Sequence, residues 1–184
     1  MLLLIVLVVI ALVVIIGGVA MYNGLIRSKN QVENAWSQID VQLKRRLDLI
    51  PNLVETVKGY AAHEQETFRQ VIAARNAAIE APDTPEAQAG PNDMLTGALG
   101  KLFALSEAYP DLKANQNFLA LQEELTATEG RVAYARQFYN DSVLGYNNKI
   151  ESVPTVFLAK VLGYEQREYF EADDAARTVP NVDF

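Results

Sequence analysis

The chain has 184 residues, a formal net charge of −7, no Cys and a single His. Without Cys it has no disulfide, thiolate zinc site or iron–sulfur cluster, and one His cannot build a multi-His metal centre. Half of the residues are hydrophobic, which excludes a disordered chain, and the length allows one ordinary domain.

The hydrophobic residues are concentrated at the N-terminus, where 20 of the first 22 are apolar and none is charged. About 20 residues at 1.5 Å each span a hydrocarbon core of about 30 Å. Residues 1–26 are therefore predicted to be a transmembrane anchor that contacts lipid through residues 2–22. A cleaved signal peptide with Gly18-Val19-Ala20 at its cleavage site is the alternative, but no basic segment precedes the run. A buried core helix would rarely be so uniformly apolar.

Positive charge follows this segment and does not precede it. The first charged residue is Arg27, then Lys29 and Lys44-Arg45-Arg46 follow. The positive-inside rule predicts a single-pass protein with its N-terminus outside and its domain in the cytoplasm.

Residues 27–184 are predicted to form a helical domain. Between residues 28 and 80, apolar side chains recur at the a- and d-like positions of a seven-residue pattern, which predicts a long helix. Pro51 predicts a kink or a restart near residues 48–51. Residues 81–85 have loop composition, and Gly90-Pro91-Asn92-Asp93 is a second predicted break, with Asn92 or Asp93 as a cap.

Further helices are predicted after this break. The next one contains Leu95 and ends before Tyr109, and a long one covers about residues 113–152. A short helix over 154–162 closes at Gly163, and residues 164–184 form an acidic tail. The predicted fold is all-α, with a single N-terminal transmembrane helix continuing into an elongated antiparallel helical bundle of two long helices and shorter ones.

A few charged residues fall inside the apolar stripes. Arg46 and Glu64 do so in the first helical segment, and Glu129 and Arg136 do so in the last long helix. Because a buried charge is costly unless it is paired, we expect Arg–Glu ion pairs or tyrosine hydrogen bonds between helices. The alternative is a partner-binding groove, whose lining would be Arg136, Tyr139, Asn140, Tyr146 and Asn147. The segment from Trp36 to Tyr60 would face it.

Other candidate sites are incomplete. The segment His63-Glu64-Gln65-Glu66-Thr67 lacks the second His of a zinc protease helix. Glu123-Glu124 and the set Glu171, Asp173 and Asp174 are more typical of solvated acidic faces than of a calcium site. We therefore expect no catalytic residue, metal or cofactor. Residues 27–75 carry a net charge of +2, which suits anionic headgroups, whereas residues 76–184 carry −9, which disfavours nucleic acid.

The sequence resembles the LemA family of bacterial membrane proteins over nearly its whole length. The resemblance is carried by the block from Val32 to Arg46, by Asp48 to Val54, and by shorter matches at the positions Tyr22-Asn23-Gly24, Val57-Lys58-Gly59-Tyr60, His63-Glu64, Ala74-Arg75, Tyr109 to Ala114, Phe118, Glu129, Arg136, Tyr139-Asn140, Tyr146-Asn147, Pro154, Tyr169-Phe170-Glu171 and Pro180 to Phe184. It implies one N-terminal span in the bacterial inner membrane followed by an antiparallel helical bundle, and no established enzymatic activity. Some similar proteins occur beside membrane proteases, and a magnetosome-associated relative is thought to help shape membrane compartments.

The predicted function is a non-enzymatic, membrane-anchored scaffold or adaptor that presents a protein-interaction surface near the inner membrane. The expected partner is a membrane protein, with a membrane protease as one candidate. The alternative is a self-assembling protein, a homo-oligomer that organises or shapes membrane. The end Val182-Asp183-Phe184 is a weaker partner feature, since strand-adding domains capture such carboxylates, whereas a packed terminus is the simpler interpretation.

Overall fold

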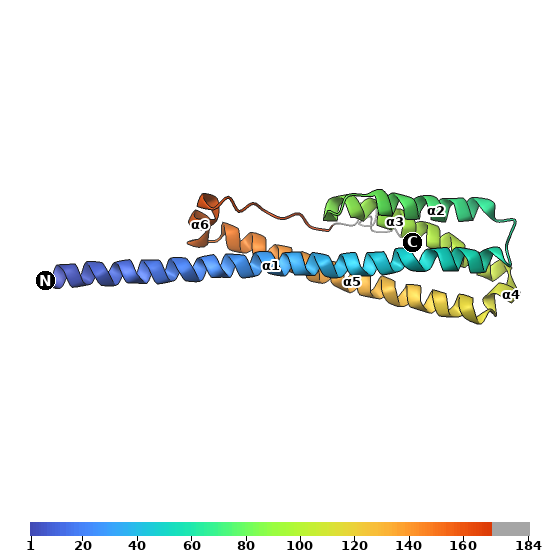
Figure 1. Cartoon of the computed structure of the whole chain (residues 1–184), viewed down its shortest axis with the longest axis horizontal. Helices are drawn as coiled ribbons and strands as arrows, with labels where there is room; N and C mark the ends of the chain where they lie inside the picture. Colours follow the sequence, from blue (N-terminus) through green and yellow to red (C-terminus); the bar gives the residue numbers. More distant parts are fainter. Residues whose placement is uncertain (171–184) are drawn as a thin grey trace, which may run out of the picture. The chain divides into compact units, whose positions relative to one another are not determined.

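The computed structural model describes residues 1–170, and every regular element among them is an α-helix (Figure 1). The all-α prediction is confirmed. The helices are α1 (Leu2–Lys58), α2 (Gln65–Glu80), α3 (Pro85–Ala108), α4 (Pro110–Lys113), α5 (Gln116–Glu151) and α6 (Thr155–Val161).

The first part of α1 is the long apolar helix that the sequence predicts. Its large hydrophobic residues from Met1 to Ile16 are all solvent-exposed, and none of its most apolar 18-residue stretch is buried. By length and composition, α1 is the one helix among residues 1–170 that could cross a membrane.

The described residues divide into two compact units. One contains Met1–Ser37 and Gln137–Glu168, and the other contains Gln38–Arg136 with Tyr169 and Phe170. The helices α1 and α5 each contribute a segment to both units.

In the first unit, α5 is held to α1 by a lysine at its C-terminal end. The ammonium of Lys149 donates to the backbone carbonyl of Gly24 and to the hydroxyl of Ser28, both at 3.0 Å. Farther along the same two helices, the Trp36 and Tyr139 rings meet edge to face with centroids 5.7 Å apart. These contacts fix the register of the two helices within this unit.

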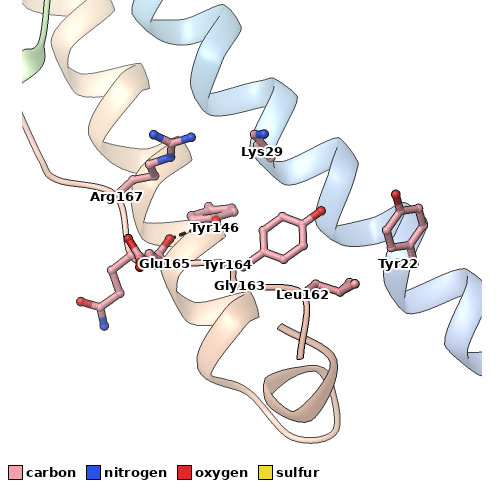
Figure 2. Close-up of a pocket in the computed structure, with 9 residues that line it drawn as sticks. Tyr22, Lys29, Tyr146, Leu162, Gly163, Tyr164, Glu165 and Arg167 are labelled. Atoms are coloured by element: carbon pink, nitrogen blue, oxygen red, sulfur yellow. Dashed lines mark hydrogen bonds between the residues drawn. The ribbon is translucent and has the colours of Figure 1, made fainter. Parts of the chain in front are cut away.

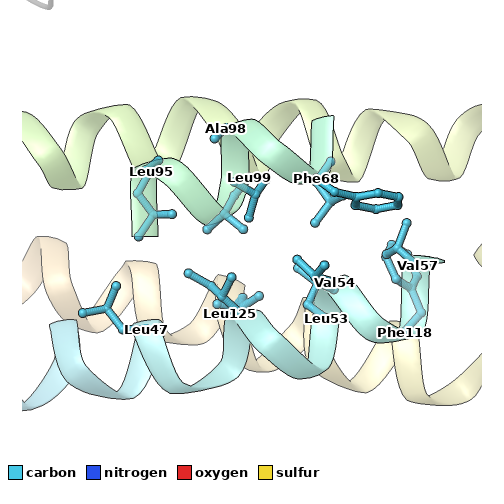
Figure 3. Packing of buried hydrophobic residues seen from close by; sticks show 14 of the residues in the cluster. Leu47, Leu53, Val54, Val57, Phe68, Leu95, Ala98, Leu99, Phe118 and Leu125 are labelled. Carbon is cyan, nitrogen blue, oxygen red and sulfur yellow. The ribbon is translucent and has the colours of Figure 1, made fainter. Parts of the chain in front are cut away.

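The second unit contains an apolar core between segments of α1, α2, α3 and α5 (Figure 3). Its fully buried members include Ile50, Leu53, Val57, Val71, Leu95, Leu102 and Leu112. Arg46 pairs with Glu129, whereas Tyr60 accepts a hydrogen bond from Asn115. The α1 and α5 segments of this unit therefore run in opposite directions. The elongated antiparallel bundle proposed for the whole domain stays a prediction.

Pro51 lies inside α1, and the predicted restart near residues 48–51 is wrong. Proline lacks the N–H that would bond to the carbonyl four residues earlier, which here is that of Leu47. The side chain of Arg75 replaces the missing donor, because its Nε donates to the Leu47 carbonyl at 2.9 Å. The chain leaves the helix after Lys58 instead, so the stripe predicted over residues 28–80 is divided between α1 and α2.

The second predicted break, at residues 90–93, is also wrong. The helix α3 begins at Pro85 and continues through Pro91. Thr84 provides the start, since its hydroxyl accepts from the Ala87 amide at 3.4 Å, and proline suits the first helical position. Asn92 caps nothing and is fully buried within the helix.

The remaining boundaries agree closely with the sequence. The helix α3 ends at Ala108, before Tyr109, and α5 and α6 lie within three residues of their predicted limits. Gly163 has a φ of +69°, and the Tyr164 amide donates to the Ala159 carbonyl at 3.0 Å, which closes α6 as predicted. The short helix α4 was not predicted. Residues 171–184, most of the predicted acidic tail, lie outside the described residues.

Candidate functional site

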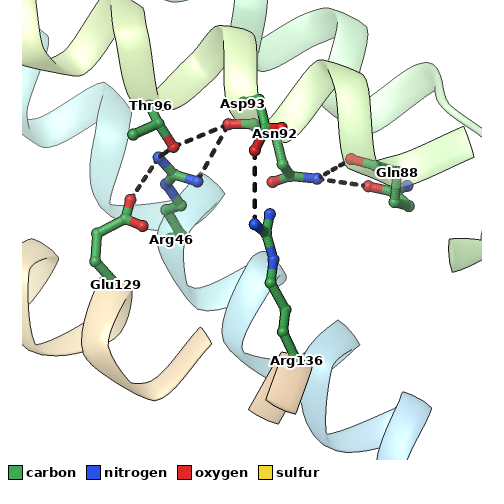
Figure 4. A network of polar contacts seen from close by, with 7 residues as sticks. All are labelled: Arg46, Gln88, Asn92, Asp93, Thr96, Glu129 and Arg136. Carbon is green, nitrogen blue, oxygen red and sulfur yellow. Dashed lines mark hydrogen bonds and ion pairs between the residues drawn. The ribbon is translucent and has the colours of Figure 1, made fainter. Parts of the chain in front are cut away.

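A polar network surrounds Arg46 in the second unit (Figure 4). Arg46 comes from α1 and its side chain is 1% exposed. One nitrogen of its guanidinium lies 2.5 Å from a Glu129 carboxylate oxygen of α5 and donates to the Thr96 hydroxyl of α3 at 2.7 Å. The other donates to the Asn92 carbonyl at 3.4 Å. A single side chain therefore links three helices.

Opposing effects act on the pKa of the Arg46 guanidinium. Burial lowers the pKa of its guanidinium from the ordinary value, and the positive charge of Arg136 lowers it further. The Glu129 carboxylate acts in the opposite direction and favours the charged form. Glu129 itself is 39% exposed. Arg46 thus depends on Glu129 for its charge compensation more than Glu129 depends on Arg46.

Three residues on one face of α3 extend the hydrogen-bond network around Arg46. Asn92 donates to both the backbone carbonyl and the side-chain oxygen of Gln88, at 2.8 and 2.9 Å. The Thr96 hydroxyl donates to the Asn92 carbonyl at 3.0 Å. Gln88, Asn92 and Thr96 are four residues apart and so lie on one helical face. Gln88 and Thr96 were not predicted as site residues and Asn92 was expected only as a helix cap, because a break was predicted at residues 90–93; the four-residue spacing of the three was a usable signal.

Arg136 also contacts α3, through Asp93, and it does not form the ion pair with Glu129. Its guanidinium lies 3.5 Å from an Asp93 carboxylate oxygen, and it stacks over the Phe170 ring with 4.4 Å between the guanidinium carbon and the ring centroid. Its partner is therefore an aspartate of α3, in the segment where the sequence predicted a break, rather than a glutamate.

Glu64 lies elsewhere. The sequence placed it on the stripe of the first helical segment, but it occupies the junction between α1 and α2. There it accepts a hydrogen bond from the Tyr109 hydroxyl at 3.1 Å. This bond raises the pKa of Tyr109. Glu64 is thus separated from the Arg46 network and joins the start of α2 to the end of α3.

The first unit contains a second polar cluster, in which α5 binds the extended segment after α6. The Tyr139 hydroxyl donates to the Glu168 carbonyl at 2.9 Å. The Tyr146 hydroxyl donates to the Glu165 carbonyl at 3.0 Å, as Figure 2 shows. Asn147 donates to the Arg167 carbonyl and accepts from the Arg167 amide, both at 2.9 Å. An asparagine that pairs in both directions with one residue's backbone holds an extended chain as a neighbouring strand would.

The side chains expected to line a partner groove are thus engaged within the chain. Tyr139, Tyr146 and Asn147 are each less than 9% exposed, and burial raises the pKa of both tyrosines. Trp36 packs edge-on against Tyr139, and Asn140 is half-buried. The stripe is occupied by the chain's own segment over residues 165–168.

Of the acidic residues considered as calcium ligands, Glu124 has other partners, and the C-terminal set lies outside the described residues. Glu124 pairs with Arg45 at 2.6 Å and with Arg131 at 3.5 Å. Within residues 1–170, no group of three His, Asp or Glu side chains is arranged to hold a metal ion. Glu171, Asp173, Asp174 and the C-terminal Val182-Asp183-Phe184 lie outside the described residues.

An open groove in the second unit is a candidate binding surface among the described residues. It has a volume of about 760 Å³ and lies along α2, from the end of α1 past Phe68 and Ile72. Ile72 is 36% exposed, and Ile79, seven residues later on the same helix, is 51% exposed. The described lining of the groove includes the cations Lys58 and Arg69 and no carboxylate. It is a concave apolar surface with positive charge at its rim.

Comparison with known proteins gives one family. The family model described as the LemA family matches residues 35–184. The chain is 26% identical over 182 residues to the magnetosome protein MamQ of Magnetospirillum gryphiswaldense, across 85% of this chain and 67% of that protein. It is 29% identical over 158 residues to the protein LemA of Metamycoplasma hominis, across 84% of this chain and 71% of the relative. The family resemblance expected from the sequence is confirmed.

Proposed function

The chain belongs to the LemA family, and from this premise we propose that it is a membrane-anchored scaffold that presents a helical protein-binding surface. In this proposal the chain acts by binding a partner rather than by catalysing a reaction. The observation that carries the proposal is the open groove along α2, because the other candidate surface, the α5 stripe, is already filled by the chain's own segment.

The chemistry of the groove defines its partner. Phe68 forms its floor and is only 4% exposed, whereas Ile72 stands at its edge. An amphipathic helix from a membrane protein fits such a groove when its apolar ridge covers Ile72 and acidic residues flank the ridge to meet Lys58 and Arg69. Both cations are exposed: the Arg69 side chain is 75% exposed and pairs with Glu66, and Lys58 lies over the Phe68 ring with its ammonium 5.7 Å from the ring centroid.

The apolar part of α1 supports attachment of the chain to a membrane. Its exposed side chains from Leu2 to Ile16 require a nonaqueous environment, and Arg27 and Lys29 follow it. We assign the chain to the bacterial inner membrane with its N-terminus outside and its helical domain in the cytoplasm, on the basis of this charge distribution.

Site-specific photo-cross-linking of the full chain in native membranes tests the proposal. A photoreactive amino acid replaces Ile72 in one variant and Leu119 in the control, because Leu119 is similarly exposed, at 46%, but lies on α5 away from the groove. We expect one discrete membrane-protein adduct from position 72 and none from position 119. Equal, diffuse labelling from both positions would exclude a protein-binding groove at this place.

Self-assembly into a membrane-organising array is the second candidate function. It is supported by the similarity to proteins named as magnetosome proteins and by two exposed apolar residues of the second unit, Val41 at 58% and Tyr134 at 72%. If it holds, a photoreactive amino acid at position 41 or 134 gives an adduct that contains two copies of this chain. Size measurement in detergent at high protein concentration separates the two functions, since a monomer removes the self-assembly proposal.

A further inference from the structure

A cleft of about 450 Å³ in the first unit lies where α1 leaves its apolar stretch (Figure 2). Tyr22 and Lys29 of α1 form one wall, Tyr146 of α5 forms the back, and Tyr164 and Arg167 come from the segment after α6. The volume is within the range of about 300–1,000 Å³ that is usual for small-ligand pockets. The segment that carries Tyr164 and Arg167 is held by Tyr146 and Asn147, so the cleft is a built feature.

The two cations of the cleft are incompletely neutralised. Lys29 and Arg167 share one carboxylate, that of Glu33, and each lies 3.8 Å from it. Their side chains are 40% and 47% exposed. Glu165 is the acidic residue among the described lining, and the ion pairs of Lys29 and Arg167 are both made with Glu33 rather than with its carboxylate. Lysine and arginine donors at such long distances from their carboxylate remain able to bind a phosphate oxygen.

The depth of the cleft matches the polar surface of a bilayer. Tyr22 ends the apolar run, and aromatic residues are enriched at that boundary. Lys29 comes seven positions later, which is about 10 Å along a helix. The headgroup layer on each side of the hydrocarbon core is about 5–8 Å deep, so the Lys29 side chain reaches back into it.

An exposed apolar ridge adjoins the cleft. Phe157 and Val161 are four residues apart within α6 and are 67% and 83% exposed, and Val153, which precedes the helix, is 76% exposed. Leu162, which follows them, lines the cleft opposite Tyr22. The ridge therefore stands beside the end of the apolar stretch of α1, and large apolar side chains at that level are suited to the bilayer interface.

We propose that α6 lies in the bilayer interface through Phe157 and Val161, and that the adjoining cleft binds the phosphate of a phospholipid headgroup through Lys29 and Arg167. This inference rests on the proposed membrane anchoring of the chain. It adds a second lipid contact, from a segment more than 120 residues away in the sequence, which fixes how the first unit sits on the membrane.

Photoactivatable phosphatidylglycerol in phosphatidylcholine nanodiscs tests the cleft in the full chain. We expect lipid adducts on residues 162–167, and we expect their yield to fall at least about tenfold in a Lys29→Gln/Arg167→Gln variant, which loses two charged donors. The control is Arg27→Gln, which removes the same charge from an exposed residue of the same helix that does not line the cleft. Lys29→Arg should keep the adducts, which separates lost charge from lost folding.

The outcomes are distinct. Equal adduct yields from the wild-type chain and the double variant would overturn the headgroup site. Competition by inorganic phosphate alone, without a lipid adduct, would also overturn it and would indicate a soluble anion. A chain that does not enter nanodiscs contradicts the membrane anchoring itself.

A fluorophore attached at Phe157→Cys tests the placement of α6. It should be quenched by lipids labelled near the headgroup, and the same fluorophore at Leu144→Cys, which is 49% exposed on α5, should not be quenched. Equal quenching at both positions would refute the placement of α6.

Discussion

The Arg46–Glu129 pair makes an asymmetric prediction, because its two members differ in burial. Arg46→Met removes a charge whose burial is costly, and it leaves no partner stranded. Glu129, at 39% exposure, is hydrated by water, and the Asn92 carbonyl still accepts from the Thr96 hydroxyl. Glu129→Gln instead leaves the Arg46 guanidinium charged and 1% exposed, beside the like charge of Arg136.

The magnitudes follow from this difference. Removing one partner of a buried ion pair costs about 3–5 kcal/mol, whereas replacing a buried charge with an apolar group of similar volume is often close to neutral. We expect Glu129→Gln to lower the free energy of unfolding by about 3 kcal/mol, the lower end because Glu129 is partly exposed. Arg46→Met should lower it by about 1 kcal/mol or less. The substitution at the more exposed residue is therefore the more damaging one.

Urea unfolding of the full chain in detergent, followed by circular dichroism, measures both changes. The control is Glu66→Gln, which breaks a pair whose side chains are 66% and 75% exposed and should change stability by under about 0.5 kcal/mol. If Arg46→Met proves more destabilising than Glu129→Gln, the electrostatic reasoning is refuted, and Arg46 acts mainly through packing and its hydrogen bonds.

Four further results are expected. Arg136→Ala should lower stability by about 1–2 kcal/mol, since it loses the Asp93 pair and the Phe170 contact, and unchanged thermal stability would rule out a structural role. Arg75→Met should lower the free energy of unfolding by about 1–2 kcal/mol, because the Leu47 carbonyl loses its donor. This cost should shrink in a Pro51→Ala background, where the backbone amide of residue 51 can donate to Leu47 instead. An equal cost in both backgrounds would show that Arg75 does not compensate for Pro51. Asn147→Leu should release residues 165–168 and speed hydrogen exchange of the Arg167 amide by about 30-fold, the equivalent of two lost hydrogen bonds. The same substitution at the exposed neighbour, Asn148→Leu, should not change this exchange rate. Unchanged exchange in Asn147→Leu would contradict the role of Asn147 in holding this segment. Burial raises the pKa of Tyr139 and Tyr146, so their neutral forms contribute stability that is complete below a pH of about 10 and is lost as the pH rises through the raised pKa. Tyr139→Phe and Tyr146→Phe should each reduce this loss of stability at alkaline pH. Tyr134→Phe, at an exposed position, should leave the loss unchanged.

Periodicity predicts the helices well and their breaks poorly. The apolar positions of α5, such as Phe118, Leu125 and Val132, are buried as the seven-residue pattern indicates. Pro51 and Pro91 were expected to interrupt helices, but each removes a single backbone donor, and distant side chains can compensate for that loss, as Arg75 does at Leu47. Compensation by a residue 28 positions away is invisible in local sequence.

The candidate site was predictable as residue types and not as pairs. Charges inside apolar stripes identified Arg46, Glu129 and Arg136, because an unpaired buried charge is too costly to tolerate. Of their partners on α3, Asp93 lies in the segment whose Gly and Pro content suggested a break, and Thr96 follows it closely. The contacts of Tyr139, Tyr146 and Asn147 go to backbone atoms of residues 165–168, and backbone partners leave no trace in side-chain patterns.

Single-cysteine labelling in sealed vesicles tests most directly the claim that the first part of α1 spans the bilayer and holds the helical domain on one side. The chain has no Cys, so Ile10→Cys, His63→Cys and Glu86→Cys each supply one reporter without background. We expect a water-soluble maleimide to label positions 63 and 86 in vesicles with the cytoplasmic face outward, to miss both in intact cells, and to leave position 10 unlabelled in either. Labelling of position 10 at the rate of position 63, or of positions 63 and 86 from opposite sides, would contradict the claim.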